Sequence, residues 1–374
     1  MYGPFAVPWI DDFAPPHVRT LDVYQPGKPI DELERELGIT GAIKVASNEN
    51  PLGPSPRALA ALPGALSQLH LYPDAGGFVL RRALSAKLGV QIEQLALGNG
   101  SNDLLYQLVL ATCEPSDEVL THKHAFLSYR LAAQVAGRPF VAAPTTADLE
   151  CDVRALIAAM TKHTKLVVIG TPNNPTGSVV TQAGAEQILA ALPARALLVI
   201  DEAYSEYAAE WPEVDKADGL ALLRKDPRVV VLRTFSKIYG LAGLRVGYAI
   251  ADRAVIDVLG RVTRSFHVGS LALVGATAAL ADQDHVAISA RHARAAIEQL
   301  QTEVKAARVY PSCANFVLID CGKPSTPVYE KLLRMGIIVR PMAMFAGLPN
   351  HIRVSVASHQ DMPRVIAALN QALA

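Results

Sequence analysis

Seven short apolar runs alternate with helical patterns between residues 94 and 250, and they constrain the fold more than any other feature of the sequence. Apolar runs of this length, bounded by turn-forming residues, are typical of strands in a buried and mostly parallel sheet. The expected strands are 94–98, 118–121, 140–143, 166–170, 196–200, 229–233 and 246–250. The connection from Arg233 to Val246 is too short for a comfortable helical crossover, which favours an antiparallel last strand.

The chain length predicts more than one domain. At 374 residues it exceeds the roughly 250–300 residues at which chains divide. Shorter expected strands at 314–320, 337–340 and 351–356, with a helix near 326–335, indicate a second, α+β unit. We therefore expect an α/β fold with an N-terminal arm and helix at 1–44 that belongs to the smaller domain, a large domain at 45–265 and a small domain at 266–374.

The composition narrows the class of ligand. Lys plus Arg and Asp plus Glu both number 35, so no net field attracts nucleic acid or an anionic membrane, and a small-molecule ligand is expected. The longest mildly apolar stretch, 271–281, has about half of the roughly 20 residues that a membrane span needs. No signal peptide pattern is present, and the four cysteines form no CxxC pair, so a reducing cytoplasm is expected.

Several catalytic motifs are missing from the sequence. It has no HExxH, so we expect no metal site. It also has no Gly-x-Ser-x-Gly elbow and no GKS/T phosphate loop, which disfavours a serine hydrolase and a P-loop enzyme.

Two charged residues follow expected strands at the sheet edge, where ligands of open α/β sheets bind. Asp201 comes directly after strand 196–200 and either holds a positive charge or complements a helix dipole. Lys237 follows strand 229–233 and either forms a Schiff base with a carbonyl compound or is an ordinary solvated lysine.

Other loops offer groups for an anion. The glycine-rich run 97–103 follows a strand and opens a helix, which fits either a phosphate site or a plain turn. The rigid loop 171–177 carries two asparagines between its prolines. Arg340 and Arg353 lie in otherwise apolar strands, so each needs a counter-anion, either a ligand or an internal acid.

Four motifs in this order resemble the fold-type-I pyridoxal-phosphate aminotransferases: Asn174-Pro175-Thr176-Gly177, Asp201-Glu202-Ala203-Tyr204, Ser236-Lys237 and Arg245. The segments 46–54, 71–74, 97–103 and 233–248 are similar to those of the histidinol-phosphate aminotransferase subfamily, and the resemblance extends from about Tyr24 to the C-terminus. It implies a seven-stranded, mostly parallel sheet in the large domain. The segment 264–269 departs from the subfamily, in which Pro-Phe-Asn-Val-Asn is more usual.

The resemblance implies a role for each matching residue around pyridoxal 5'-phosphate (PLP). Lys237 would form the Schiff base and transfer the proton, and Asp201 would pair with the pyridinium nitrogen. Tyr204 and Asn174 would bind the 3-oxygen of the cofactor, and Phe126 would stack on its ring. The remaining implied cofactor-binding residues hold the phosphate: Gly100, Ser101, Asn102, Ser236, Arg245 and, from the other subunit of a homodimer, Tyr72. Those implied to contact the substrate are Tyr24, Asn48, Asn315, Arg340 and Arg353.

The implied reaction is transfer of an amino group from L-histidinol phosphate to 2-oxoglutarate, which forms imidazole acetol phosphate and L-glutamate in histidine biosynthesis. An aromatic amino-acid aminotransferase on the same scaffold is the nearest alternative. A PLP-dependent threonine-phosphate decarboxylase shares the lysine, the aspartate and the arginine clamp. A PLP-binding regulatory module would require an attached DNA-binding domain, and residues 1–44 leave no room for one.

Overall fold

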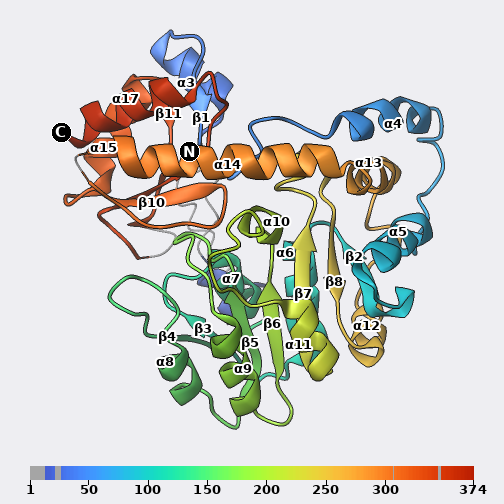
Figure 1. The fold of residues 1–374 in the computed structure, drawn as a ribbon. Coiled ribbons are helices and arrows are strands. Elements are labelled where there is room, and N and C mark those ends of the chain that lie inside the picture. The colour runs from blue at the N-terminus through green and yellow to red at the C-terminus, as the bar shows by residue number, and fades with distance from the viewer. Residues whose placement is uncertain (1–12, 22–26, 306, 344–346) are drawn as a thin grey trace.

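The computed structural model describes residues 13–21, 27–305, 307–343 and 347–374. A seven-stranded sheet in the order β2-β8-β7-β6-β5-β3-β4 forms its centre (Figure 1). Its strands are β2 (Leu95–Gly98), β3 (Glu118–His122), β4 (Phe140–Ala143), β5 (Thr164–Gly170), β6 (Leu197–Asp201), β7 (Val229–Thr234) and β8 (Gly247–Ile250). β8 runs antiparallel to both of its neighbours, while the pairs from β7 to β4 are parallel. The expected strands and the reversed direction of the last one are therefore confirmed.

Alternating residues of the central strands face two different helix layers. Val199 of β6 packs against α6 (Ser101–Thr112), α7 (Leu127–Val135) and α12 (Arg253–Gly260). Leu198 and Ile200 of the same strand belong to the core on the other face. That face is covered by α8 (Val153–Ala158), α9 (Gln182–Ala191) and α11 (Gly219–Lys225). Both faces are thus buried, which explains why the strands read as continuous apolar runs.

A second layer of helices lies above the sheet in Figure 1. The long α14 (Gln283–Glu303) crosses the molecule there, next to the short α10 (Ser205–Ala208). At one end, α13 (Ser270–Leu280) packs against α4 (Pro56–Leu66) and α5 (Phe78–Leu88). Two 3-10 turns, η1 (Ile92–Gln94) and η2 (Ala242–Leu244), precede β2 and β8.

The C-terminal third builds a smaller antiparallel sheet in the order β12-β13-β10-β9. Its strands are β9 (Arg308–Val309), β10 (Phe316–Asp320), β12 (Arg340–Pro341) and β13 (His351–Ser355). A separate parallel pair joins β1 (Ile43–Lys44) to β11 (Ile337–Ile338). The helices α15 (Ser325–Arg334) and α17 (Met362–Leu373) pack against each other beside these strands.

The single strand expected at 337–340 is wrong. Ile337 and Ile338 pair with β1, whereas Arg340 and Pro341 pair with β13 in the other sheet. Pro341 has no N–H to continue a ladder, so the second pairing stops after two residues. One apolar run therefore contributes to two sheets, and Arg340 belongs to the smaller antiparallel one.

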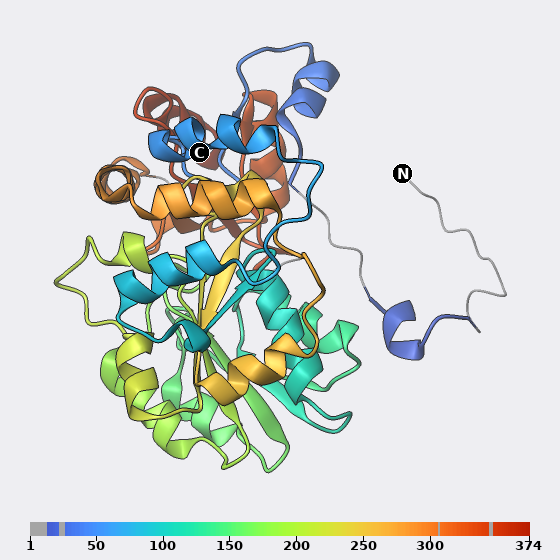
Figure 2. The ribbon, with the colours of Figure 1, turned by 90° about the vertical axis from the view of Figure 1, so that its right-hand side faces the viewer.

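The N-terminal region contributes two peripheral helices. α2 (Pro16–Arg19) lies beside α7 at the side of the molecule (Figure 2). α3 (Ile30–Leu37) ends at Gly38, whose φ of 64° is the left-handed conformation that glycine adopts readily at the end of a helix. The proposed boundaries at 44 and 265 remain predictions.

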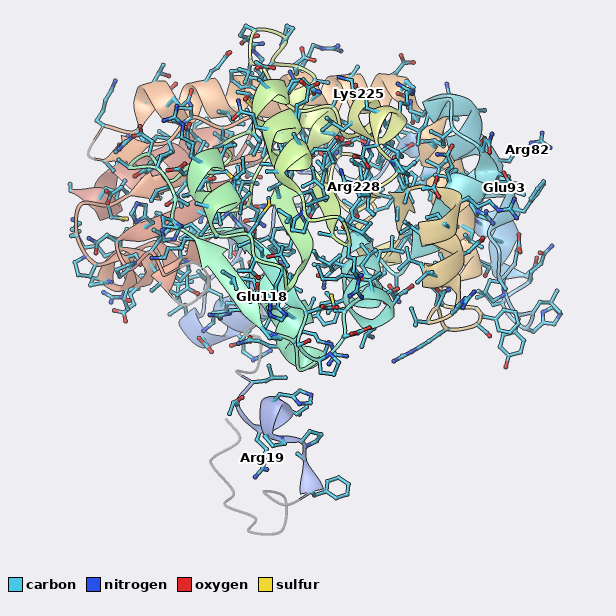
Figure 3. The ribbon with its side chains drawn as sticks, turned by 90° about the horizontal axis from the view of Figure 1, so that it is seen from below. Arg19, Arg82, Glu93, Glu118, Lys225 and Arg228 are labelled. Atoms are coloured by element: carbon cyan, nitrogen blue, oxygen red, sulfur yellow. The ribbon has the colours of Figure 1, made fainter. Side chains whose placement is uncertain are left out.

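Charged side chains lie at one end of the large sheet. Figure 3 views the end at which the parallel strands begin, where Glu118, Lys225 and Arg228 lie. Arg228 pairs with Asp226 at 2.7 Å, and Lys225 pairs with Glu186 at 2.7 Å.

No helix in the described part of the chain is long and apolar enough to cross a membrane. Within the same ranges, no group of three or more His, Cys, Asp or Glu side chains is placed to hold a metal ion.

Candidate active site

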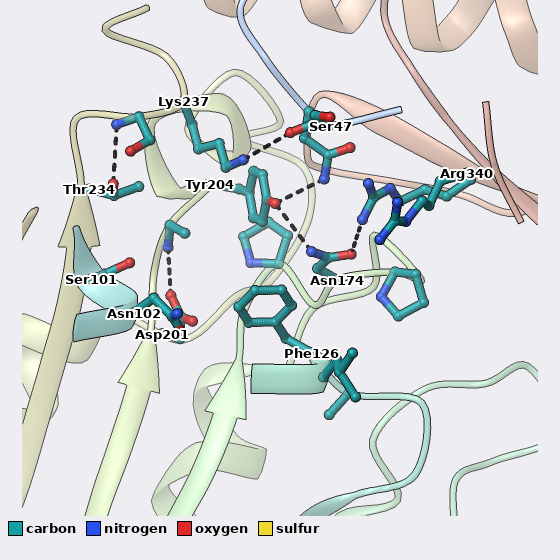
Figure 4. Close-up of a pocket in the computed structure, with 18 of the residues that line it drawn as sticks. Ser47, Ser101, Asn102, Phe126, Asn174, Asp201, Tyr204, Thr234, Lys237 and Arg340 are labelled. Carbon is teal, nitrogen blue, oxygen red and sulfur yellow. Dashed lines mark hydrogen bonds between the residues drawn. The ribbon is translucent and has the colours of Figure 1, made fainter. Parts of the chain in front are cut away.

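A pocket opens at the carboxyl ends of β5, β6 and β7, between the large sheet and the smaller one (Figure 4). Twelve of the residues predicted from the sequence line it. They are Asn48, Ser101, Asn102, Phe126, Asn174, Asp201, Tyr204, Ser236, Lys237, Arg245, Arg340 and Arg353. Residues from both sheets and from the segment before α4 therefore converge on one site.

Asp201 is the last residue of β6, and its carboxylate is held on both oxygens. Oδ1 accepts the backbone N–H of Ala203 at 3.2 Å, and Oδ2 accepts the hydroxyl of Tyr129 at 3.0 Å. Desolvation in the pocket raises the pKa of Asp201 to about 6, although the bonds from Tyr129 and Ala203 and the charge of Lys237 act in the opposite direction. The carboxylate is thus suited to hold a cation near neutral pH.

Lys237 is the third residue after the end of β7, and its amine points across the pocket toward the segment before α4. Nζ donates to the carbonyl of Ser47 at 3.2 Å and lies 5.7 Å from the centre of the Tyr204 ring. Desolvation, followed by the positive charges of Arg353 and Arg245, lowers the pKa of Lys237 to about 8. A fraction of the amine is therefore neutral near physiological pH, as a nucleophile or base requires.

The hydroxyl of Tyr204 is the centre of an amide network. It accepts Nδ2 of Asn48 at 2.9 Å and Nδ2 of Asn174 at 3.5 Å. Oδ1 of Asn174 in turn accepts Nη1 of Arg353 at 2.6 Å, and Nη2 of Arg353 donates to the carbonyl of Ala46. Ser355, which the sequence analysis missed, bonds both the backbone and the side chain of Asn48. This network fixes Arg353 at the rim of the pocket.

The opposite end of the pocket gathers groups for an anion. The first turn of α6 begins there at Ser101 and Asn102, and first-turn N–H groups have no partner within a helix. Gly100, with a φ of 87°, precedes this turn, and a Cβ on it would lie 2.6 Å from the guanidinium of Arg245. Arg245 donates to the Ser236 hydroxyl at 3.2 Å. The positive φ therefore favours glycine at position 100, and a Cβ there would require the Arg245 guanidinium to shift.

Phe126 caps α7 at the side of the pocket, edge-on to Tyr129 at 5.8 Å between ring centres. Tyr129 and Thr234, which also line the pocket, were missed by the sequence analysis. A tyrosine within an amphipathic helix carries no signal that separates a site residue from a core residue. Thr234 ends β7, so the strand-end argument could have found it.

Among the described residues, three predicted ones do not line the pocket. Gly100 instead lies against the guanidinium of Arg245, as described above. Asn315 is fully buried behind the pocket wall, where its amide donates to the carbonyls of Asn48 and Glu49 at 3.1 and 3.2 Å. Tyr72 is 81% exposed and stacks on Phe266 at 4.6 Å. Tyr24 lies outside the described residues.

The pocket thus has a basic end, a carboxylate in its floor and a lysine with a lowered pKa between them. Such a site suits a phosphorylated compound that also carries a cationic ring. The basic residues Arg340 and Arg353, which are 7% and 8% exposed, offer a second place for an anion.

Known proteins resemble this chain over nearly its whole length. Residues 40–369 match the family model "Aminotransferase class I and II". The chain is 45% identical to histidinol-phosphate aminotransferase 1 of Nitrosococcus oceani, with 95% of each chain covered. It is also 45% identical to histidinol-phosphate aminotransferase of an Anaeromyxobacter species, with 96% of this chain and 98% of the relative covered.

A solved structure agrees with the fold. Histidinol-phosphate aminotransferase from Sinorhizobium meliloti, in complex with pyridoxal-5'-phosphate, matches with a TM-score of 0.86 and 30% identity, and 96% of each chain is covered. The fold class, the enzyme class and the family resemblance inferred from the sequence are confirmed by these matches. The chain belongs to the aminotransferase class I and II family, and within it to the histidinol-phosphate aminotransferases.

Proposed function

We propose that the protein transfers the amino group of L-histidinol phosphate to 2-oxoglutarate with PLP as cofactor, and so forms imidazole acetol phosphate and L-glutamate in histidine biosynthesis. The observation that carries this proposal is the convergence of Asp201, Lys237 and Arg353 on one pocket in a chain of this family. The names of the 45% identical relatives support the choice of substrate.

The residues of the pocket fit PLP from end to end. Arg245, Ser236 and the first turn of α6 form a donor set for its phosphate, and Gly100 leaves room for the Arg245 side chain. Asp201 supplies the anionic partner for a protonated ring nitrogen. Phe126 offers a ring face, and Tyr204 with Asn174 offers donors for the 3-oxygen. When bound, PLP supplies a carbon that takes up the amino group and a ring that accepts the electrons released at the substrate.

Lys237 is the residue that we assign to move the substrate proton. Its Nζ removes the proton from the carbon that bears the amino group, and the lowered pKa of Lys237 makes the neutral amine available for this task. Asp201 keeps the proton on the ring nitrogen of the cofactor.

Arg353, held by Asn174 and the Ala46 carbonyl, is placed to bind the phosphate of the donor or a carboxylate of 2-oxoglutarate. We assign Asn48, Arg340, Asn315 and Tyr24 to the substrate side as well, with Asn315 acting through Asn48.

We further propose a cytoplasmic homodimer in which Tyr72 reaches the cofactor phosphate of the other subunit. Tyr72 does not line the pocket of its own chain, and its side chain projects to solvent. Exposed apolar side chains surround it in the sequence, including Leu69, Leu71 and Phe78. An apolar surface of this kind typically marks a protein interface.

The test is the absorbance spectrum of purified protein with PLP, recorded before and after addition of L-histidinol phosphate. We expect the visible band of the bound cofactor to disappear with the donor and to return with 2-oxoglutarate. Lys237→Ala should lack both changes, whereas the surface variant Lys225→Ala should retain them. A band that responds to phenylalanine alone would favour the aromatic aminotransferase, and carbon dioxide release from O-phosphothreonine would favour the decarboxylase.

A further inference from the structure

Tyr129 makes a direct contact with the carboxylate in the floor of the pocket. It lies in α7, is 1% exposed, and its hydroxyl donates to Oδ2 of Asp201 at 3.0 Å. The contact joins a helix on one face of the sheet to the end of β6. Burial raises the pKa of Tyr129 well above its usual value, so the hydroxyl remains protonated and can only donate to an ionised Asp201.

The end of β5 leaves space for this hydroxyl. Gly170 is the last residue of β5, next to Asp201 in the sheet register. A Cβ at position 170 would lie 2.9 Å from the Tyr129 hydroxyl, closer than such contacts occur. A residue with a Cβ at position 170 would therefore require the Tyr129 hydroxyl or the strand to shift. The glycine at the end of β5 thus leaves room for the hydrogen bond.

The bonds to Asp201 leave capacity for a ligand. A carboxylate has about four acceptor positions, and Ala203 and Tyr129 use one on each oxygen. The titratable groups that act on Asp201 through charge or hydrogen bonding are Tyr129 from α7, Glu202 and Tyr204 from the segment after β6, and Lys237 from the loop after β7. Glu202 raises the pKa of Asp201, whereas Tyr129 and Lys237 lower it. Tyr129 is thus a neutral group that favours the ionised form of the carboxylate.

We propose that Tyr129 is a positioning residue, whose hydroxyl keeps the Asp201 carboxylate ionised and directed at the ring nitrogen of the cofactor. The proposal rests on the proposed function, because it assigns the ring nitrogen of PLP to Asp201. Loss of the hydroxyl would allow the carboxylate to rotate and would shift the shared proton from the ring nitrogen toward Asp201. The edge-on contact of Tyr129 with Phe126 would remain in a phenylalanine variant.

The experiment compares wild-type holoenzyme with Tyr129→Phe, both loaded with PLP that carries ¹⁵N at the ring nitrogen. We expect the ¹⁵N chemical shift of the variant to move toward that of the unprotonated ring. We also expect PLP to bind about tenfold more weakly, which is the lower range for loss of a hydrogen bond to a charged group. The maximal rate should fall while the KM for the donor changes little.

Two further variants separate positioning from a general structural effect. Tyr248→Phe removes a hydroxyl that is equally buried but does not line the pocket, and should leave the ¹⁵N shift unchanged. In an Asp201→Asn background, Tyr129→Phe should have little additional effect on PLP binding, because the carboxylate through which it acts is gone. Gly170→Ala retains Tyr129 but places a methyl group against its hydroxyl, and should shift the ¹⁵N resonance in the same direction.

The outcomes distinguish this inference from the proposed function. A wild-type protein that takes up no PLP would overturn both. A wild-type protein that takes up PLP, with an unchanged ¹⁵N shift and unchanged PLP affinity in Tyr129→Phe and Gly170→Ala, would overturn the role of Tyr129 alone. An equal loss of PLP affinity from Tyr129→Phe with and without the Asp201 carboxylate would likewise reject it.

Discussion

The floor of the pocket and the outer surface around Tyr72 differ in how far their side chains are buried and hydrogen-bonded within one chain. In the floor, Asp201 is bonded on both oxygens, and Tyr204 is 4% exposed within its amide network. Around Tyr72, by contrast, Leu71 and Val79 are 58% and 67% exposed. Arg245, at the basic end of the pocket, is also exposed. The fold of one chain thus encloses the groups proposed for the cofactor ring more fully than those proposed for its phosphate, as the proposed homodimer requires.

Asp201→Asn should have the largest effect on the floor of the pocket. The amide is of similar size but carries no charge, so it cannot hold a proton on the ring nitrogen. We expect the maximal rate to fall by about 10²–10³-fold, the scale for loss of one preorganised electrostatic partner. Lys237 remains, so mass spectrometry after borohydride reduction should still find PLP on it. A variant that keeps near wild-type turnover would contradict the assigned role of Asp201.

The two regions also differ in how well the sequence predicts them. Strands β5, β6 and β7 are buried on both faces, so their apolar runs identify them, and the residues after them are placed by the sheet alone. This is why Asp201 and Lys237 could be found before the structure. Tyr129 could not, because its contact depends on how α7 packs over β6. The division of residues 337–341 between two sheets could not be predicted either. Which sheet a residue joins depends on its partner strand, and the apolar run itself does not reveal that partner.

Val79→Glu tests whether the outer apolar surface is an interface. Val79 lies in α5 and is exposed in the single chain. A charge buried there without a partner should weaken the dimer by about 10- to 100-fold, as measured by sedimentation velocity at several concentrations. Ile288→Glu is the matched control, since Ile288 is 51% exposed on α14, in another part of the molecule. Equal weakening of the dimer by the two variants would contradict the proposal that the surface around Tyr72 is the dimer interface.

The pH dependence of PLP uptake tests the environment of Lys237. Only the neutral amine attacks a carbonyl carbon, and the pKa of Lys237 is lowered to about 8. Below pH 8, the rate of PLP uptake by apoprotein should therefore rise about tenfold per pH unit, and above pH 8 it should level off. The measurement is the rate of visible absorbance increase after mixing. A rate that continues to climb to pH 10, as for a solvated lysine, would contradict the lowered pKa.

Mixing of two inactive variants tests the link between the two regions directly. Tyr72→Ala and Lys237→Ala subunits are unfolded together and refolded in equal amounts. In a mixed dimer, the site that retains Lys237 borrows the intact Tyr72 of its partner, so one of the two sites is complete. Half of randomly formed dimers are mixed, so the preparation should recover about one quarter of wild-type activity. If Tyr72 instead serves the pocket of its own chain, no site in the mixture has both residues, and mixing should recover nothing beyond the average of the two variants.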